Sequence, residues 1–355
     1  MKFLTIIFFL ISLLVLSSIY ISPLDFWPIS FISLSIPFII LFNIFLFVFF
    51  VLKRKFLAAF PLIVIILGFK FIISSYSFHF SSHKDEKETF SILSYNTSRL
   101  LKEDVYSDSF LPKADEMMAW LADQDADIKC FQEFYNNDES KYWNSVEKLS
   151  QNKAYHCFFS GAKVNHTTGE IGVAIFSKHP IVNKGEIIFS SNNFNRGNYA
   201  DLVIKGDTIR VINIHLQSME IKRAGISNKK TWDDMVEDFV FLYYRIKHGT
   251  IDRSLQTKIL LDFIEESPYK VIVCGDFNET PYGYVYNAFK SKLNNSFEEA
   301  GKGFGFTYNG NTLFFLRIDN QFYSKGIEAT NLKTYSTINY SDHFPIAAKY
   351  VFNSN

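Results

Sequence analysis

Two polar side chains that follow a predicted buried strand could act on an anionic substrate. Residues 271–274 are apolar, Gly275 ends the strand, and Asp276 and Asn278 come two residues apart. Because residues two apart in an extended chain point to the same side, the carboxylate and the amide lie next to each other. Such a pair can orient a water molecule and hold a phosphoryl oxygen. Taken alone, the motif better fits an Asx-rich turn leading into residues 280–281.

Other predicted strands also end on side chains that bind metal ions or phosphate. The apolar run at residues 211–214 ends on a histidine, and two further strands end on an amide and a carboxylate. Several oxygen and nitrogen ligands at strand ends favour a reactive site over an isolated turn. These side chains are Asn96, Glu133 after Gln132, His215, and Asp342 and His343 after Ser341.

The motifs resemble those of the endonuclease/exonuclease/phosphatase superfamily. These metal-dependent phosphoesterases include deoxyribonuclease-like nucleases, inositol polyphosphate phosphatases and neutral sphingomyelinases. The resemblance covers residues 90–352, and its motifs occur in the family's order. They are Asn96, Gln132-Glu133, Gly172 to Ser177 leading to Pro180, His215, Gly275-Asp276-Phe277-Asn278, Arg317-Ile318-Asp319 and Ser341-Asp342-His343.

The resemblance implies hydrolysis assisted by a metal ion. A phosphate ester is anionic and repels a nucleophile, so catalysis needs a cation on the phosphate and a positioned water opposite the leaving group. Glu133 would bind Mg²⁺, with Mn²⁺ as the alternative, because a hard ion prefers oxygen ligands. Asn96 would lie beside Glu133, and Asp342 would complete the metal shell.

The resemblance also implies catalytic roles for the remaining motif residues. Asp276 would orient and polarise the attacking water, and Asn278 would hold a non-bridging oxygen. His343 would lie against the phosphate, and Asp319 would accept from its other ring nitrogen and fix its tautomer and charge. His215 would donate to the phosphate or to the leaving oxygen.

Further positions bear on specificity. Relatives commonly follow the aspartate that corresponds to Asp319 with an aromatic residue or histidine and then an aliphatic one, whereas Asn320 and Gln321 stand here. Arg196 is a candidate phosphate ligand, with a solvated turn arginine as the alternative, and Asn213 is a candidate for reaching the cleft. Residues 219–253 are either a helical cover or a lid that faces the substrate.

The pattern along residues 90–355 indicates a layered domain. Alternating apolar residues predict strands over residues 90–96, 172–176, 202–205, 208–216 and 271–274. Helical patterns occupy residues 113–123, 231–247 and 254–265. Strands that alternate with helices predict an α/β or α+β domain. The resemblance narrows this to a four-layered α/β sandwich, in which two packed mixed sheets are flanked by helices.

The first 75 residues form an apolar region of another kind. Residues 3–24 and 26–52 carry no charged side chain, and residues 56–75 carry only Lys70. Since roughly 20 apolar residues in a helix span a bilayer, we expect three transmembrane helices, at about residues 3–24, 28–52 and 56–75. A buried helical hairpin and, for the first segment, a cleaved signal peptide are the alternatives.

Basic residues predict the orientation of this region. Lys2 precedes the first segment and residues 53–55 are all basic, and such residues stay on the cytoplasmic side. The N-terminus is therefore expected inside. After three crossings, a polar linker at residues 76–89 leads to a catalytic domain at residues 90–355 outside the cytoplasm. If the third segment does not cross, that domain is cytoplasmic.

Charge and cysteine content limit the function classes. The net charge is zero, but residues 76–355 hold 31 basic and 35 acidic residues. A nuclease that grips a duplex usually has a basic surface, so this balance counts against nucleic acid. Cys130, Cys157 and Cys274 are odd in number and lack CxxC spacing, which argues against a disulfide framework or a zinc site. Cys130 and Cys274 are predicted core residues.

The leading hypothesis is a membrane-anchored, Mg²⁺-dependent phosphoesterase that cleaves a phosphodiester or a phosphomonoester. The anchor and the missing basic excess favour a lipid or another membrane-proximal substrate. A nuclease that acts on DNA or RNA is the alternative enzyme. The alternative of another class is a non-catalytic membrane protein that binds a phosphate ligand, and we expect such a protein to have lost Glu133, Asp276 or His343. No protein partner is evident from the sequence.

Overall fold

The chain folds into two compact units. The computed structural model describes residues 2–79, 89–100, 111–153, 155–164, 167–189, 194–219, 231–310 and 316–353, without the side chains of residues 111–112 and 151–153. The N-terminal unit comprises Met1–Ser75, Gln217–Lys258 and Glu279–Ser291. The sandwich unit comprises Tyr76–Leu216, Ile259–Asn278 and Lys292–Asn355.

One six-stranded sheet of the sandwich unit is built around the parallel pair β2 and β3, and its other neighbours pair antiparallel. Its order is β13-β14-β2-β3-β5-β4. The strands are β13 (Ile327–Thr334), β14 (Ile346–Phe352), β2 (Phe90–Asn96), β3 (Ile128–Asn136), β5 (Glu170–Ser177) and β4 (His156–Lys163).

The second six-stranded sheet contains the parallel pair β8 and β9. Its order is β10-β12-β9-β8-β7-β6. The strands are β10 (Asn294–Asn295), β12 (Asp319–Tyr323), β9 (Lys270–Asp276), β8 (Asp207–His215), β7 (Arg196–Ile204) and β6 (Ile181–Ile188).

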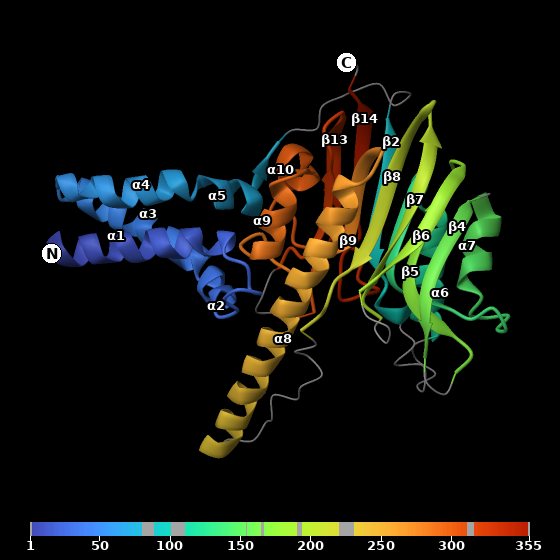
Figure 1. Ribbon diagram of the computed structural model, residues 1–355, viewed down its shortest axis with the longest axis horizontal. Helices are drawn as coiled ribbons and strands as arrows, with labels where there is room; N and C mark the ends of the chain where they lie inside the picture. The colour runs from blue at the N-terminus through green and yellow to red at the C-terminus, as the bar shows by residue number, and fades with distance from the viewer. Residues whose placement is uncertain are drawn as a thin grey trace. The chain divides into compact units, whose positions relative to one another are not determined.

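The two sheets pack face to face, and helices cover their outer faces (Figure 1). One apolar cluster fills the space between the sheets and includes Ile92, Cys130, Val211 and Cys274, which are all 0% exposed. This confirms the predicted sandwich of two mixed sheets flanked by helices, and it confirms both cysteines as core residues.

Helices cover the outer faces through their own apolar residues. On one face, α6 (Leu111–Asp123) contributes Met117 and Leu121 to a second cluster, and α7 (Ser145–Lys153) packs beside it. On the other face, the last turns of α8 (Trp232–Glu265) place Phe263 against Tyr199 of β7, with ring centroids 5.0 Å apart. The short helix α10 (Ser296–Ala300) contributes Phe297 to the central cluster.

Two predictions about the helices and the linker need correction. The separate helices expected at residues 231–247 and 254–265 are parts of one 34-residue helix, α8. Gly249 lies inside it, because one glycine costs a helix only about 1 kcal/mol. Part of the expected linker is ordered, since β1 (Ser77–Phe78) pairs with β11 (Lys302–Gly303). Residues 80–88 lie outside the described residues.

The sheet register explains why polar side chains meet at one place. The parallel pairs β2–β3 and β8–β9 each align their carboxyl ends, with Asn96 opposite Gln132 and His215 opposite Asp276. Gly275 allows β9 to approach β8 closely next to the aligned residues His215 and Asp276, because it has no side chain. Its φ is +140°, and a Cβ atom there would lie 2.0 Å from the carbonyl oxygen of Ile214.

The N-terminal unit consists of helices. They are α1 (Lys2–Ser17), η1 (Ser18–Tyr20), α2 (Ile29–Leu34), α3 (Ile36–Leu52), η2 (Phe56–Ala58), α4 (Ala59–Leu67), α5 (Phe69–Ser75), the first part of α8, and α9 (Tyr284–Lys290). Among the described residues, one helix, Lys2–Tyr20, is long and apolar enough to cross a membrane. A second candidate exists if the bent pair Phe56–Leu67 and Phe69–Ser75 counts as one span.

The second and third predicted spans are interrupted in the structure. Helix α2 ends before Ser35, and α3 has 17 residues, or about 25 Å, against a bilayer core of about 30 Å. Pro37 in the first turn of α3 cannot continue the preceding helical hydrogen bonds. The third segment bends by 50° at Gly68, between α4 and α5.

Candidate active site

Asp276 is the central carboxylate of a buried polar cluster at the carboxyl end of β9, where it is 1% exposed. Its Oδ2 accepts a hydrogen bond from Nδ2 of Asn96 at 3.0 Å, and its Oδ1 accepts from the backbone N–H of Asn278 at 2.8 Å. The Nε2 atoms of His215 and His343 each lie 3.7 Å from Oδ2. Burial raises the pKa of Asp276, although both histidines act against that shift.

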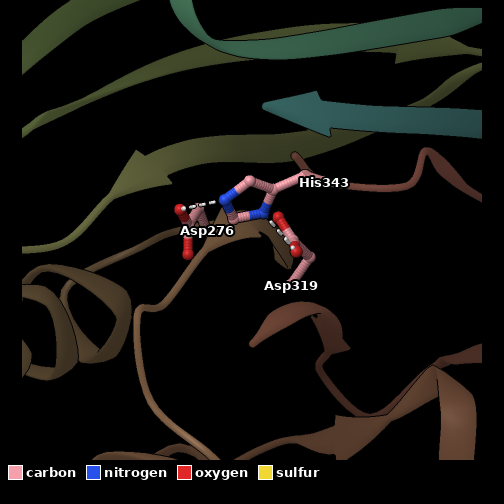
Figure 2. Close-up of side chains that lie close together, drawn as sticks. All are labelled: Asp276, Asp319 and His343. Carbon is pink, nitrogen blue, oxygen red and sulfur yellow. Dashed lines mark hydrogen bonds and ion pairs between the residues drawn. The ribbon is translucent and has the colours of Figure 1, made fainter. Parts of the chain in front are cut away.

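His343 lies between two carboxylates (Figure 2). Its Nδ1 is 2.8 Å from Oδ2 of Asp319 at the start of β12, and its Nε2 faces Asp276. Burial lowers the pKa of His343, but Asp319, Asp276 and Asp342 together raise it to about 10. The imidazole is therefore a cation at neutral pH, and Asp319 holds its orientation.

Glu133 of β3 is the second carboxylate near Asp276, and Asn96 at the end of β2 lies between the two. Nδ2 of Asn96 lies 3.4 Å from Oε1 of Glu133. Glu133 has a φ of +47°, at an irregularity in the pairing of β3 with β5. Thr97 steadies this backbone, because its Oγ1 donates to the carbonyl oxygens of Gln132 and Glu133 at 3.1 Å each. A non-glycine residue held at positive φ costs about 1–3 kcal/mol, and such strain clusters at functional sites.

His215 completes the cluster from the end of β8. Its Nε2 lies 3.7 Å from Oε1 of Glu133, and the residue is 4% exposed. Neither of its ring nitrogens has a hydrogen-bond partner within the described part of the chain. A buried polar atom without a partner is costly, so an imidazole in this position suits a ligand that completes its hydrogen bonds.

Two other predicted site residues lie beside the cluster. Asn278 has a φ of +49°, and its Nδ2 donates to the carbonyl oxygen of Leu216 at 2.9 Å. Asp342 is next to His343, and its Oδ1 accepts from Oγ of Ser341 at 3.3 Å. Their predicted contacts with the phosphate and the metal stay predictions.

The amide of Asn213 turns away from the cluster, and Arg196 contacts another strand, so the predicted contact of Arg196 with a phosphate stays a prediction. Asn213 is 0% exposed, and its amide joins the two sheets through the carbonyl oxygens of Phe131 and Ala174, at 2.9 and 3.0 Å, and through Nε2 of Gln132. Arg196 is buried at the start of β7, and its Nη1 donates to Oγ of Ser160 at 3.2 Å. Both side chains therefore connect strands.

Gln321, the second of the two unusual residues after Asp319, has a structural explanation. Nε2 of Gln321 donates to the carbonyl oxygens of Ile92 and Ile346, at 3.2 and 3.3 Å, and its Oε1 accepts from the hydroxyl of Tyr350 at 2.7 Å. A polar side chain here connects β12 with the opposite sheet. It leaves the contact between Asp319 and His343 intact.

Sequence reasoning missed Arg99, whose Nε lies 3.4 Å from Oε2 of Glu133. It follows the Asn96 strand end by three residues, and the φ values of residues 98–100 are all positive, between 45° and 61°. The only signal in the sequence was a basic residue shortly after a strand that ends on a site residue. Residues 101–110 lie outside the described residues.

The donor set suits a divalent cation. Asp276, Asp319 and His343 form a buried group whose ligand atoms lie within 4.8 Å of one another. Nδ1 of His343 and Oδ2 of Asp319 are engaged with each other, so the carboxylate of Glu133 is the more suitable oxygen ligand, and Asp276 lies beside it. A cation would offset the repulsion between these carboxylates.

Solved structures share this fold. One is an endonuclease/exonuclease/phosphatase family protein from Leptotrichia buccalis, with 18% identity, a TM-score of 0.53, and coverage of 73% of this chain and 98% of that chain. An endonuclease/exonuclease/phosphatase from Beutenbergia cavernae has 13% identity and a TM-score of 0.56. The match covers 75% of this chain and 72% of that chain. D. rerio TDP2, complexed with a single-strand DNA product, has 17% identity and a TM-score of 0.51. The match covers 76% of this chain and 100% of that chain.

A family model described as the Endonuclease/Exonuclease/phosphatase family matches residues 93–343. The chain belongs to this family. Family members are generally hydrolytic phosphoesterases and typically depend on divalent metal ions, and the buried group around Asp276 is consistent with both properties. A second model, a domain of unknown function, matches residues 1–75. The comparison with curated proteins found no match.

Proposed function

We propose that this family member is a membrane-anchored, Mg²⁺-dependent phosphoesterase that hydrolyses a phosphodiester or a phosphomonoester with an activated water. The observation that carries the proposal is the position of Asp276. Its carboxylate faces His215 and His343 at 3.7 Å each, and Asp319 lies behind His343. This arrangement provides a carboxylate that can accept a proton next to a cationic imidazole.

Glu133, with Asn96 beside it and Asp342 nearby, would hold the Mg²⁺ ion. When bound, the ion would polarise the phosphoryl oxygens and offset their negative charge. The oxygen atoms of Glu133 and the nearby amide of Asn96, whose Nδ2 lies 3.4 Å from Oε1 of Glu133, support this assignment. Mn²⁺ has similar ligand preferences and is expected to substitute for Mg²⁺.

Asp276 would orient the attacking water and accept its proton. The raised pKa of Asp276 makes it a stronger base than an exposed aspartate. His343, held protonated by Asp319, would donate a hydrogen bond to the phosphate and stabilise the charge that develops in the transition state. Asn278 would hold a non-bridging oxygen, and His215 would donate to the phosphate or the leaving oxygen.

The substrate proposal depends on the N-terminal unit. The candidate span Lys2–Tyr20 supports anchoring. With the bent pair Phe56–Leu67 and Phe69–Ser75 and the shorter apolar helix Ile36–Leu52 as further crossings, and with basic residues at positions 2 and 53–55, we propose three crossings that leave the N-terminus inside and residues 76–355 outside the cytoplasm. An anchored enzyme meets phosphate esters near the bilayer, such as lipids. A phosphatase or β-lactamase reporter fused after residue 80 is expected to be active outside the cytoplasm, and activity confined to the cytoplasm contradicts this topology.

A nuclease is the second candidate function. The similarity to D. rerio TDP2, whose structure contains a single-strand DNA product, favours this candidate. The 31 basic and 35 acidic residues of residues 76–355 oppose it, because nucleic-acid binding relies on neutralising phosphates with basic side chains.

Hydrolysis by the full chain distinguishes these candidates. The purified chain in detergent is given phospholipids, small phosphodiesters, phosphomonoesters, DNA and RNA, with Mg²⁺, Mn²⁺ or a chelator. Metal-dependent release of product from a lipid or a small ester supports the first proposal, and release from DNA or RNA alone supports the nuclease. Tight binding without product from any substrate overturns the enzyme proposal in favour of a non-catalytic phosphate-binding protein.

A further inference from the structure

The first half of α8 carries a row of exposed large apolar side chains. Trp232, Met235, Val236, Phe239 and Val240 are 75, 59, 45, 69 and 44% exposed. Their spacing of three and four residues places them on one face of the helix, which we call the apolar face of α8. Exposed apolar patches of this kind mark interaction surfaces.

The other side of the same helix is acidic. Residues 232–240 contain four acidic side chains and no basic one. In a helical projection these acidic residues lie away from the apolar face, so this part of α8 is strongly amphipathic. The four residues are Asp233, Asp234, Glu237 and Asp238.

The apolar face of α8 continues to Tyr243, where another segment of the N-terminal unit covers it. The rings of Tyr243 and Trp27 are in edge contact, with centroids 4.8 Å apart and planes at 88°. Nζ of Lys247 lies 5.5 Å from the centroid of the Trp27 ring. Trp27 belongs to the loop that follows the candidate span Lys2–Tyr20. The apolar face therefore adjoins the end of a helix that can cross a bilayer.

This continuity favours lipid as the occupant of the apolar face. With Lys2–Tyr20 in a bilayer, as proposed above, the loop that holds Trp27 would lie near the bilayer surface. The contact between the rings of Trp27 and Tyr243 would hold this part of α8 beside that loop. Trp and Tyr are enriched where apolar chains meet headgroups, and Trp27, Trp232, Tyr243 and Tyr244 provide four such rings.

We propose that residues 232–244 of α8 lie along the surface of the lipid bilayer, with the apolar face in the boundary between headgroups and acyl chains. The inference rests on the proposed membrane anchoring. Because the polar face is acidic, burial of apolar and aromatic side chains drives the contact. It therefore requires no anionic lipid and persists at high salt.

Spin labels on the two faces of α8 test this placement. The full chain carries Cys157→Ala, because Cys157 is partly accessible while Cys130 and Cys274 are fully buried. Single cysteines are added as Phe239→Cys or Val236→Cys on the apolar face, with Glu237→Cys as the matched control on the acidic face. Each chain is labelled with a nitroxide and reconstituted in phosphatidylcholine vesicles.

Relaxation by oxygen, which concentrates in the bilayer, is then compared with relaxation by a water-soluble nickel complex. The oxygen-to-nickel ratio is expected to be at least about threefold higher at positions 236 and 239 than at position 237, with and without added salt. Equal, water-like ratios at all three positions overturn the inference. Spin–spin broadening between chains at position 239 assigns the apolar face to a second copy and also overturns it.

Alkaline carbonate extraction of the same vesicles distinguishes the two levels of the proposal. If carbonate releases the chain from the vesicles, the proposed anchoring fails. If the chain resists extraction while positions 236 and 239 stay in water, anchoring stands and only the inference about α8 fails. Metal-dependent hydrolysis is measured on every labelled chain, and unchanged turnover shows that the cysteine substitutions leave the sandwich unit folded.

Discussion

The two units place large apolar side chains in opposite environments. In the sandwich unit, Phe131 and Phe322 are 0% exposed, whereas Phe3, Phe38 and Phe45 of the N-terminal unit are 73, 72 and 61% exposed. Among the described residues, 37 of the 43 exposed large apolar side chains belong to the N-terminal unit. The sandwich unit buries its apolar surface within itself, and the N-terminal unit presents its own to the surroundings.

The comparison shows why the reactive residues lie in the sandwich unit. Its two sheets are held in register by a dry core, so strand ends can keep carboxylates and imidazoles within 4 Å of one another. The N-terminal unit has a small buried cluster that includes Ile36 and Val64, but many of its large apolar side chains face outward. This outward-facing apolar surface supports the proposed anchoring at a bilayer, where lipid would cover it.

The largest expected effect concerns Asp276 and His343. Replacing either by Ala is expected to lower turnover by about 10³-fold or more, because a proton acceptor or a phosphate-stabilising cation is lost. Steady-state hydrolysis with saturating Mg²⁺ measures this change. Asp207→Ala, at the opposite end of β8 from His215, is the matched control. Near wild-type turnover in either site variant contradicts the assigned role.

The next largest effect is expected when Asp319, the partner of His343, loses its charge but keeps its shape. Asp319→Asn is expected to lower turnover by about 10²-fold, because the pKa of His343 falls when its anionic partner is removed. The remaining activity should decline with rising pH at a lower pH than in the wild type. A pH profile of turnover checks this, and a profile that does not move contradicts the role of Asp319.

The same ion pair predicts a pH dependence of stability. Folding raises the pKa of His343 from 6.5 to about 10, so its contribution is fully present below pH 6.5 and is lost as the pH rises toward 10. Denaturant unfolding of the metal-free chain should show this loss between those pH values. In Asp319→Asn the slope should be smaller, and an equal slope in both chains contradicts the assignment to His343.

A pair of phenylalanine substitutions tests the comparison of the two units directly. Phe131→Ala, in the sandwich core, is expected to lower the free energy of unfolding of that unit by about 3–5 kcal/mol. Phe45→Ala, whose side chain is 61% exposed, should change it by less than about 0.5 kcal/mol. Chemical denaturation in detergent, followed by tryptophan fluorescence, gives both values. Similar losses of unfolding free energy in the two variants would contradict the difference in burial between the two units.

A further small effect is expected inside the N-terminal unit. Nδ2 of Asn43 in α3 donates to Oγ of Ser12 in α1 at 3.1 Å, and both residues are buried. Hydrogen bonds between helices in a membrane contribute only about 0.6 kcal/mol. Asn43→Ala should therefore reduce the thermal stability of the reconstituted chain only slightly and leave hydrolysis unchanged. A large loss of hydrolysis would show that the two units are not independent.

The central strands and their terminal residues could be predicted from the sequence, because buried strands have a distinct apolar pattern. Residues 90–96 and 271–274 mark β2 and β9, and the motif residues after them meet in the cluster. The resemblance provided the pairing of His343 with Asp319, which composition alone does not encode. The geometry also supports Asp276 as the centre of the cluster.

Other features depend on contacts that the sequence does not reveal. Asn213 shares a strand with His215, but packing between the sheets directs its amide to Phe131 and Ala174. Arg99 comes close to Glu133 only because the backbone after β2 adopts positive φ values. The continuity of α8 through Gly249 reflects the small cost of one glycine, which a sequence pattern does not distinguish from a break between two helices.

Hydrolysis in ¹⁸O-labelled water tests the central claim most directly. The full chain is incubated with Mg²⁺ and a phosphate ester that it turns over, and the product is analysed by mass spectrometry. Attack of an activated water predicts one ¹⁸O atom on the phosphorus of the product for each bond cleaved, together with loss of turnover on chelation and in Asp276→Asn. Tight binding without any product, or metal-independent turnover that survives Asp276→Asn, would contradict the account.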